Sequence, residues 1–248
     1  MIISTRAIVL KTIQYGDSSI ICRLFTKDHG KVVIIAKGAW RPKNNAGPIL
    51  EPMNHIDVQY YNKNNRDIQI LKNVTLANQF SLLRTHLTRI VLGQIIVESL
   101  DKVTLVNNPA PILYRLAWRV LEKMDQPNVN YWMIFSFYLY HLSVRLGFMP
   151  NLDMCSKCQS VLEKACIDNI TGELICKDCS TLNKISLNYK SLVFLQKLRI
   201  MHLDEIENEN AISKEMLSTL NFLKVFNCIH LVGMNKVRSL DMIQKILT

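Results

Sequence analysis

The spacing of apolar residues changes once along this chain, near residue 80, and the change limits the folds that the chain can adopt. Before it, turn sequences such as Lys27-Asp28-His29-Gly30 separate five short β-branched and apolar segments, at 6–14, 18–26, 31–36, 55–61 and 67–76. After it, apolar residues recur with helical spacing. Five short strands joined by tight turns predict a small closed barrel. We therefore expect an α+β protein, with a five-stranded OB-type β-barrel at 1–79 followed by an α-helical domain at 80–248.

The second part of the chain predicts a helical bundle. Helices are expected from Ser81, as N-cap, to about residue 98, and at 110–124, 130–146, 188–201, 213–231 and 239–247. Pro111 suits a helix start, where a missing N–H costs nothing, and Gly147 suits a helix end. Segment 131–140 is apolar nearly all round, which predicts a central, buried helix. No regular element is expected at 39–48, which is rich in Asn, Gly and Pro.

Four of the seven cysteines form two closely spaced pairs. Cys155-Ser-Lys-Cys158 is followed, after 17 residues, by Cys176-Lys-Asp-Cys179. Each pair lets two thiolates face one ion from a single tight turn, and the two turns together complete a tetrahedron. Thr171-Gly172-Glu173, between the pairs, predicts a hairpin turn that brings them together. Four thiolates leave no open position for water or substrate. The spacing thus predicts one structural Zn²⁺ in an insert at about 151–185, with ordinary free thiols as the alternative.

The other three cysteines are not expected to bind metal. Cys166 lies within the insert at the wrong spacing for either pair, and Cys22 and Cys228 lie in apolar runs, where a buried thiol acts as a small hydrophobic side chain. An odd cysteine count favours a reducing compartment. The longest stretch without Lys, Arg, Asp or Glu, 126–144, is too short and interrupted to span a bilayer, and residues 1–10 lack the features of a signal peptide. We expect a cytoplasmic protein without a membrane partner.

The net charge of +10 is concentrated in the first third of the chain. Residues 1–79 contain 11 basic and 5 acidic side chains, whereas the insert at 151–185 contains 4 and 5. Such an excess favours an anionic partner, nucleic acid first and an acidic membrane surface second. Cations that follow phosphates and aromatic rings that stack on bases suit a binder of single strands. The candidate DNA-binding residues are Arg6, Lys11, Arg23, Lys37, Trp40, Arg41, Lys43, Lys63 and Arg66. The alternative is a solvated basic face on which Trp40 anchors a loop.

Signatures of catalysis are missing from the sequence. It contains no GxxxxGKS/T, GxGxxG, GxSxG or HExxH motif, and its six histidines are scattered. Its acidic residues form no cluster of the kind that a nuclease metal site needs. We therefore expect a binding protein rather than an enzyme. The alternatives are a metal-dependent nuclease and a zinc-ribbon protein that binds RNA or acts in transcription.

Three stretches, in this order, carry a family resemblance. The chain opens with RAIVLKTIQYGDSSIICRLFTKDHGKVVIIAKGAWRPKN, continues with helices interrupted by the CxxC…CxxC insert, and closes with VGMNKVRSLDMI. In these features it resembles the bacterial RecO family of recombination mediators. The resemblance implies an oligonucleotide-binding barrel, a helical domain and a four-cysteine zinc module. By motif position, Lys37, Arg41 and Lys43 fall in the basic loop of the barrel, and Cys155, Cys158, Cys176 and Cys179 fall at the zinc ligands.

The resemblance also implies partners and an activity. RecO-like proteins bind single- and double-stranded DNA, anneal complementary strands and bind the acidic tail of single-strand-binding protein. With a RecR-type partner they load the recombinase onto coated DNA, which implies a place in the bacterial cytoplasm near the nucleoid. For the acidic tail we expect a helical groove edged by cations, with Arg115, Arg119 and Arg145 as candidates. The alternative for each of these arginines is a surface salt bridge.

Overall fold

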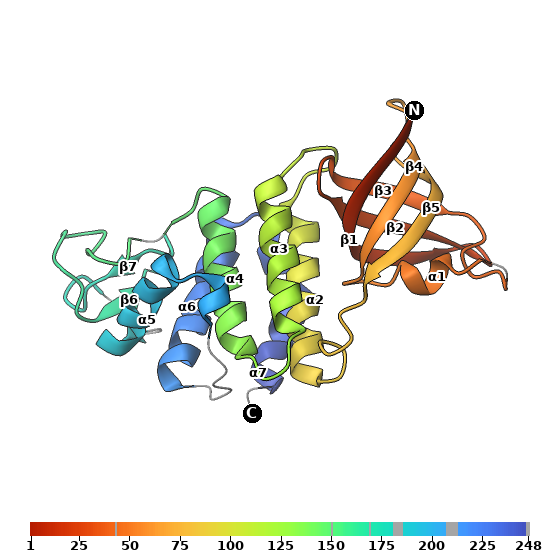
Figure 1. The fold of residues 1–248 in the computed structure, drawn as a ribbon. Helices are drawn as coiled ribbons and strands as arrows, with labels where there is room; N and C mark the ends of the chain where they lie inside the picture. Colours follow the sequence, from red (N-terminus) through yellow and green to blue (C-terminus); the bar gives the residue numbers. More distant parts are fainter. Residues whose placement is uncertain (43, 150, 169, 181–185, 207–212, 247–248) are drawn as a thin grey trace. The chain divides into compact units, whose positions relative to one another are not determined.

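The computed structural model describes residues 1–42, 44–149, 151–168, 170–180, 186–206 and 213–246 (Figure 1). The contacts within it divide the chain into two compact units. The first contains Met1–Asp125 and Lys236–Thr248, and the second contains Gln126–Asn235. The second unit is therefore an insertion into the first. The domain boundary near residue 80 stays a proposal: it marks the end of the barrel, whereas the first compact unit continues beyond it.

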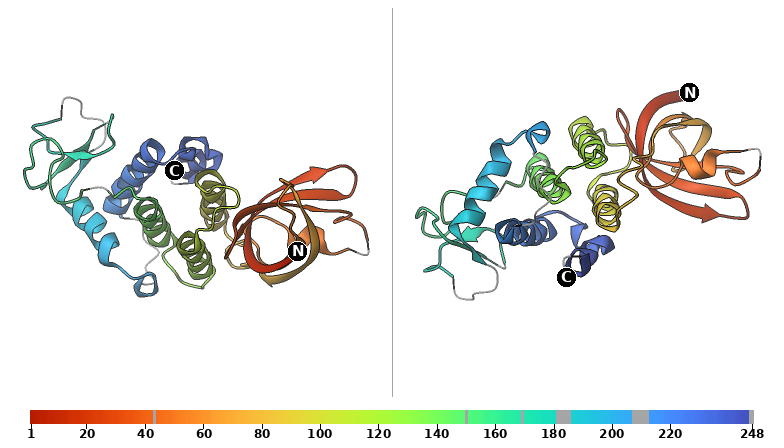
Figure 2. Two further views of the ribbon diagram at one scale, coloured as in Figure 1. Left: turned by 90° about the horizontal axis from the view of Figure 1, so that it is seen from above. Right: turned by 60° about the horizontal axis from the view of Figure 1, so that its bottom comes forward.

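Five strands form a closed barrel, which confirms the predicted fold of the first third (Figure 2). The strands are β1 (Ile2–Tyr15), β2 (Ser19–Thr26), β3 (Gly30–Ala36), β4 (His55–Tyr61) and β5 (Gln69–Asn78). Their order around the barrel is β1-β2-β3-β5-β4. Every neighbouring pair is antiparallel except β3 and β5, whose parallel pairing of Ile34 with Gln69 and Ile35 with Ile70 closes the barrel.

Alternation of side chains explains why these segments build a barrel. Along β2, Ile20, Cys22 and Leu24 point into the core, whereas Ile21 and Arg23 remain partly exposed between them. Burial raises the pKa of the Cys22 thiol to about 11, with an opposing contribution from the Thr12 hydroxyl. Cys22 therefore stays neutral and acts as the small hydrophobic side chain that was predicted. The core also includes Ala7, Val9, Ile34, Ile56, Val58 and Tyr60.

The expectation of no regular element at 39–48 is wrong, because one helical turn, α1 (Ala46–Ile49), forms there. The Asn44 side chain starts this turn by accepting a hydrogen bond from the N–H of Ala46 at 3.1 Å. The ring of Trp40 packs against Gly47, where an added Cβ would lie 2.5 Å from the ring. Trp40 thus anchors the loop while 50% of its surface stays exposed.

Helices α2 (Leu87–Val103) and α3 (Pro111–Met124) belong to the same compact unit as the barrel (Figure 1). Helix α2 is preceded by His86, not by the predicted N-cap Ser81, since residues 81–85 form turns. Long-range contacts compete with helix formation there. The N–H of Leu83 donates to the Asp125 carboxylate at 2.8 Å, and the Arg84 guanidinium donates to the Pro52 carbonyl at 2.8 Å.

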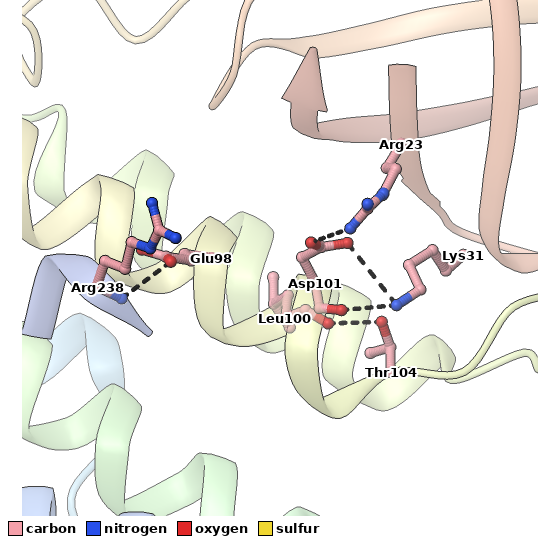
Figure 3. A network of polar contacts seen from close by, with 7 residues as sticks. All are labelled: Arg23, Lys31, Glu98, Leu100, Asp101, Thr104 and Arg238. Carbon is pink, nitrogen blue, oxygen red and sulfur yellow. Dashed lines mark hydrogen bonds and ion pairs between the residues drawn. The ribbon is translucent and has the colours of Figure 1, made fainter. Parts of the chain in front are cut away.

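A charged network joins β2 and β3 to α2 (Figure 3). The buried carboxylate of Asp101 accepts a hydrogen bond from Arg23 at 2.6 Å. The Lys31 ammonium donates to the Asp101 carbonyl at 2.6 Å and lies 3.8 Å from its carboxylate. Removing one member of such a network leaves a buried charge without its partner, which is strongly unfavourable. The network therefore fixes α2 against the barrel.

The C-terminal segment returns to the first unit and packs on α2. It forms the short elements η3 (Arg238–Asp241) and α7 (Met242–Ile246), where the sequence predicted a single helix. The Glu98 carboxylate accepts a hydrogen bond from the N–H of Arg238 at 2.9 Å (Figure 3). It also accepts hydrogen bonds from the N–H and hydroxyl of Ser239 at 3.1 and 2.6 Å. Burial opposes the ionisation of Glu98, but these donors hold its pKa below the usual value.

His55 is buried where β4 meets α3. Its Nε2 lies 2.7 Å from the Tyr114 hydroxyl, and its ring stacks on that of Trp118 with the centroids 5.8 Å apart. Burial lowers the pKa of His55 below its usual value; Arg6 adds to this shift and Asp57 opposes it. The folded protein therefore favours the neutral imidazole.

We expect the free energy of unfolding to fall as the pH decreases below about 6.5, the usual pKa of histidine. In that range the unfolded chain binds a proton that the folded chain does not, so stability rises with pH. Urea unfolding at two pH values, one on each side of the histidine pKa, should show a smaller pH dependence for His55→Gln than for the wild type. Comparing the two proteins cancels proton uptake at other sites. Equal pH dependence in both would show that His55 contributes nothing.

The helices α4 (Tyr131–Arg145), α5 (Tyr189–Ile200) and α6 (Lys214–His230) form the body of the second unit. The short η1 (Leu203–Glu205) follows α5, and the short η2 (Met234–Lys236) follows α6. Asn130, Asn188 and Ser213 cap α4, α5 and α6, each accepting a hydrogen bond from a backbone N–H of the first turn. Helix α4 packs against both others, and most of its side chains are buried. This confirms the predicted central helix. Cys228 on α6 is only half-buried, so the expectation of a buried thiol there is wrong.

The insert between α4 and α5 contains a small sheet with the order β7-β6-β8. Its strands are β6 (Ala165–Ile167), β7 (Leu174–Ile175) and β8 (Ser186–Leu187), of which β8 was not predicted. β6 and β7 are antiparallel and Gly172 has a φ of +70°, which confirms the predicted hairpin turn. Among all the helices that the structure describes, none is long and apolar enough to cross a bilayer.

Candidate metal centre and nucleic-acid interface

The four predicted metal ligands meet at one point in the second unit. The Sγ atoms of Cys155, Cys158, Cys176 and Cys179 all lie within 4.8 Å of one another. The Sγ atoms of Cys158 and Cys176 are 3.7 Å apart. Zn–S bonds of about 2.3 Å would place the sulfurs of a tetrahedral centre about 3.8 Å apart, whereas a disulfide bond requires about 2.05 Å. The four sulfurs therefore fit a tetrahedral metal centre.

A tight turn positions the first pair of sulfurs. The N–H of Cys155 donates to the Ser160 carbonyl at 2.8 Å, and the N–H of Gln159 donates back to the Cys155 carbonyl at 2.9 Å. Gln159 has a φ of +62°, which lets the chain reverse direction immediately after the CxxC sequence. The N–H of Ser156 donates to the Leu174 carbonyl at 3.0 Å, so the first turn is attached to β7, the strand that leads into the second CxxC pair.

The local electrostatics favour a thiolate at Cys155 but oppose four thiolates together without a cation. Burial opposes the ionisation of Cys155, but backbone N–H groups of Cys158, Cys176 and Lys157 donate to its sulfur and lower its pKa to about 6. The Sγ atoms of Cys158 and Cys176 raise the pKa of Cys179. Since four negative sulfurs this close repel one another, all four ionise together only around a cation. The cluster thus has the chemistry of a cation site.

The surrounding insert supports the two turns. Lys157 lies between Cys155 and Cys158 in the sequence, and its ammonium forms an ion pair with the Asp168 carboxylate at 2.7 Å. Asp168 also accepts a hydrogen bond from the N–H of Ile170 at 2.9 Å, which shapes the β6–β7 hairpin. Cys166 is buried in β6 opposite Ile175 and lies outside the four-sulfur cluster, as its spacing predicted.

The loop after β3 presents three of the predicted DNA-binding residues. The N–H of Trp40 donates to the Ser18 carbonyl at 3.0 Å, so the loop is held against the turn between β1 and β2. Lys37 and Arg41 are exposed, and no ion pair to either is found among the described residues. The loop therefore offers two available cations beside a half-exposed aromatic ring. Lys43, the fourth predicted residue of this loop, lies outside the described residues.

Closure of the barrel brings Lys72, on β5, next to this loop. Ile35 of β3 pairs in parallel with Ile70 of β5, and Lys37 and Lys72 each follow two residues later. Both lysines line a groove of about 350 Å³, with Asn44, Asn45 and Asn73 as further lining residues. Sequence reasoning missed Lys72, because no local signal shows which strand will close the barrel. The sequence shows a lysine on a strand but not its neighbour.

Lys63 and Arg66 lie together in the hairpin between β4 and β5. The buried amide of Gln69 holds this hairpin: it accepts from the N–H of Lys63 at 2.9 Å and donates to the Arg66 carbonyl at 2.7 Å. A second groove, of about 310 Å³, is lined by both cations and by His29 and Asn107. Here too the cationic side chains are exposed at the rim of a polar groove.

The remaining predicted DNA-binding residues lie elsewhere on the first unit. Arg6 pairs across two strands with Asp57 at 3.3 Å, and both side chains are more than half exposed. Arg23 is engaged by Asp101 in the network that holds α2. Lys11 is exposed and lines a third groove, of about 440 Å³. The structure thus brings Lys37, Trp40 and Arg41 together and Lys63 and Arg66 together, but it does not gather all the predicted cations at one site.

The three arginines considered for an acidic peptide fall on two helices. Arg115 and Arg119 lie one turn apart on α3 in the first unit. Arg115 is exposed, whereas Arg119 pairs with Glu122 at 3.2 Å. Arg145 is exposed in the last turn of α4, in the second unit. Arg119 therefore forms the surface salt bridge that was predicted as the alternative to peptide binding.

Comparison with known proteins finds two family models that together match most of the chain. Residues 1–80 match the family model described as Recombination protein O N terminal, and residues 84–235 match Recombination protein O C terminal. A relative from Prosthecochloris aestuarii, named DNA repair protein RecO, is 31% identical over 155 residues. A relative of the same name from Salinibacter ruber is 34% identical over 152 residues.

These two alignments span 62% and 61% of this chain, and 59% and 58% of the respective relatives. A third relative of that name, from Pelodictyon phaeoclathratiforme, is 27% identical over 100% of this chain and 99% of its own length. The family matches cover both the closed barrel and the helical part of the chain with its four-cysteine insert. This chain therefore belongs to the RecO family.

Proposed function

We propose that this chain is a DNA repair and recombination mediator. It binds single- and double-stranded DNA, anneals complementary strands and helps to load a recombinase onto DNA coated with single-strand-binding protein. The observation that carries the proposal is the groove of the closed barrel where Lys37 and Lys72 are exposed beside the loop of Trp40 and Arg41. The relatives named DNA repair protein RecO support the assignment to repair.

Annealing follows from electrostatics and stacking and needs no bond chemistry. Two complementary strands repel through their phosphates, and a surface of exposed cations reduces this repulsion and raises the local concentration of both strands. The half-exposed ring of Trp40 offers a stacking surface for an unpaired base. Binding through phosphates also accounts for duplex DNA as a second ligand. The protein is thus a binding protein, not an enzyme.

The partners follow from the same charge pattern. The acidic tail of single-strand-binding protein requires cations, and Arg115 and Arg145 are exposed on α3 and α4. These are two separate candidates, one in each compact unit. On α3, Arg119 joins Arg115 if the tail displaces its exposed ion pair with Glu122, because such pairs contribute little in water. A RecR-type protein is the second proposed partner. We place the protein in the bacterial cytoplasm, associated with the nucleoid through its DNA ligand.

The metal is Zn²⁺ in this proposal, one per chain and structural. Four thiolates are the donor set that suits Zn²⁺, and they satisfy its tetrahedral preference without an open position. Cys155, Cys158, Cys176 and Cys179 would hold it. Its role is to join two turns whose neighbouring strands are only two or three residues long.

A strand-annealing assay tests the function. Two complementary labelled oligonucleotides should pair faster with the protein than without it, at low salt, without nucleotide, and also when they are coated with single-strand-binding protein. No acceleration under any of these conditions would refute the proposal. The same samples test the alternatives: cleavage that depends on a divalent metal would indicate a nuclease, and preference for structured RNA over single-stranded DNA would indicate an RNA-binding protein.

A further inference from the structure

A small cavity lies between the barrel and α3, both within the first compact unit. Its volume is about 120 Å³. Three cations line it: Arg6 from β1, Lys27 from the turn after β2, and Arg115 from α3. Three rings line it too, those of His55, Tyr114 and Trp118. This combination was not anticipated from the sequence, because these residues come from four separate segments of the chain.

The rings give the cavity a flat, largely apolar wall. The ring planes of Trp118 and His55 lie within 26° of parallel. His55 Nε2 and the Tyr114 hydroxyl hydrogen-bond to each other at 2.7 Å, so these two polar atoms are already satisfied. Trp118 is half-buried, which leaves part of its indole available to a ligand. A planar, uncharged ring is the chemical group that such a wall accepts best.

The cations favour an anion at the rim of the cavity. Lys27 and Arg115 are exposed, and the part of the chain that the structure describes contains no ion pair to either. Arg6 pairs with Asp57, but both side chains are more than half exposed, and such pairs contribute little. The other nearby carboxylate, Asp28, accepts a hydrogen bond from the Thr5 hydroxyl at 3.0 Å. The balance of charge around the cavity is therefore positive.

The size of the cavity restricts the ring. A protein cavity of about 150 Å³ is known to hold benzene, so about 120 Å³ suits a single six-membered ring better than a fused double ring. A ring bonded to an anionic backbone describes a nucleotide. We propose that this cavity receives one unstacked pyrimidine base of single-stranded DNA, with the adjoining phosphates at Lys27 and Arg115. This inference rests on the proposed function, since it names a part of the DNA site.

One consequence separates this cavity from the groove of Lys37 and Lys72. A base in a duplex is paired and stacked and does not enter a cavity, whereas an unpaired base enters without that cost. The groove recognises phosphates, which both forms of DNA carry. The cavity therefore adds affinity for single strands alone, and for pyrimidine tracts above purine tracts.

The test compares three labelled DNA ligands, oligo-dT, oligo-dA and a duplex of the same length, by fluorescence anisotropy. We expect Trp118→Leu to weaken oligo-dT binding by about 5- to 30-fold, because stacking of one base on an aromatic ring contributes on that scale. Arg115→Gln, at an exposed position, should weaken it several-fold, and Trp118→Phe should retain most of it. Duplex binding should change less than about twofold. The charge control is Lys197→Gln, which removes an exposed cation from α5 and should change none of the three.

The outcomes distinguish this inference from the proposed function. If Trp118→Leu and Arg115→Gln bind oligo-dT as the wild type does, the cavity is not a base site, although the DNA function stands. If the wild type binds no DNA at all, both proposals fail. An equal loss for oligo-dA and oligo-dT contradicts the pyrimidine assignment. If Trp118→Leu keeps oligo-dT binding but loses the binding of an acidic peptide with a C-terminal aromatic residue, the cavity is a peptide site and the inference is wrong.

Discussion

Replacing Cys176 by serine is expected to release the bound metal and to unfold the insert around it. A serine hydroxyl does not ionise at neutral pH, so only three of the four thiolates would remain. The strands that flank the cluster are too short to hold the insert: β6 has three residues and β7 has two. Structural Zn²⁺ sites contribute on the order of 10 kcal/mol of binding free energy, much of which is folding free energy.

Metal content and hydrogen exchange together check this prediction. The wild type should contain about one zinc per chain, and Cys176→Ser close to none, with amide exchange accelerated throughout the insert. Cys166→Ala is the matched control, because Cys166 is buried in the same insert but lies outside the cluster. It should keep the metal. A Cys176→Ser protein with full zinc content and unchanged exchange would contradict the assignment of the ligands.

Reversing the charges of Lys37 and Arg41 together should weaken single-stranded DNA binding by roughly 10- to 100-fold at low salt. The salt slope is the slope of the logarithm of the binding constant against the logarithm of the salt concentration, and each phosphate contact to a single strand contributes roughly 0.7 to it. Because two contacts would be lost, the slope should become shallower by about 1.4. Both side chains are exposed, and the described residues include no acidic partner for them, so the fold should tolerate Lys37→Glu with Arg41→Glu.

Two further variants sharpen this measurement. Lys72→Glu should act in the same direction, because Lys72 lines the same groove as Lys37. The matched control reverses two exposed lysines of α5, Lys190 and Lys197, which changes the net charge by the same amount in the second unit. If the control pair lowers the salt slope as much as Lys37 and Arg41 do, binding is diffuse. An unchanged slope in the groove variants would move the site, with the hairpin of Lys63 and Arg66 as the next candidate.

Local sequence was enough to predict most elements. The five strands, the central helix α4, the hairpin turn at Gly172 and the two CxxC turns all depend on residue periodicity or on contacts within a few positions. The errors occurred where distant residues compete with local preference. Ser81 has the chemistry of an N-cap, but Leu83 donates its N–H to Asp125, and α2 begins at Leu87 instead. The missed turn α1 is an exception, because Asn44 starts it through a local hydrogen bond from the N–H of Ala46.

By itself, the sequence determined the division into strands and helices, the four-cysteine cluster and the surplus of positive charge in the first third of the chain. Only the tertiary structure decided what each cation does. Arg23 and Lys31 are engaged by Asp101, which lies 78 and 70 positions away from them in the chain, whereas Lys37 is joined by Lys72 through the closure of the barrel. The physical reason is that an ion pair or a shared groove depends on distances between side chains. Those distances are set by how strands and helices pack, which charge and periodicity along the sequence do not specify.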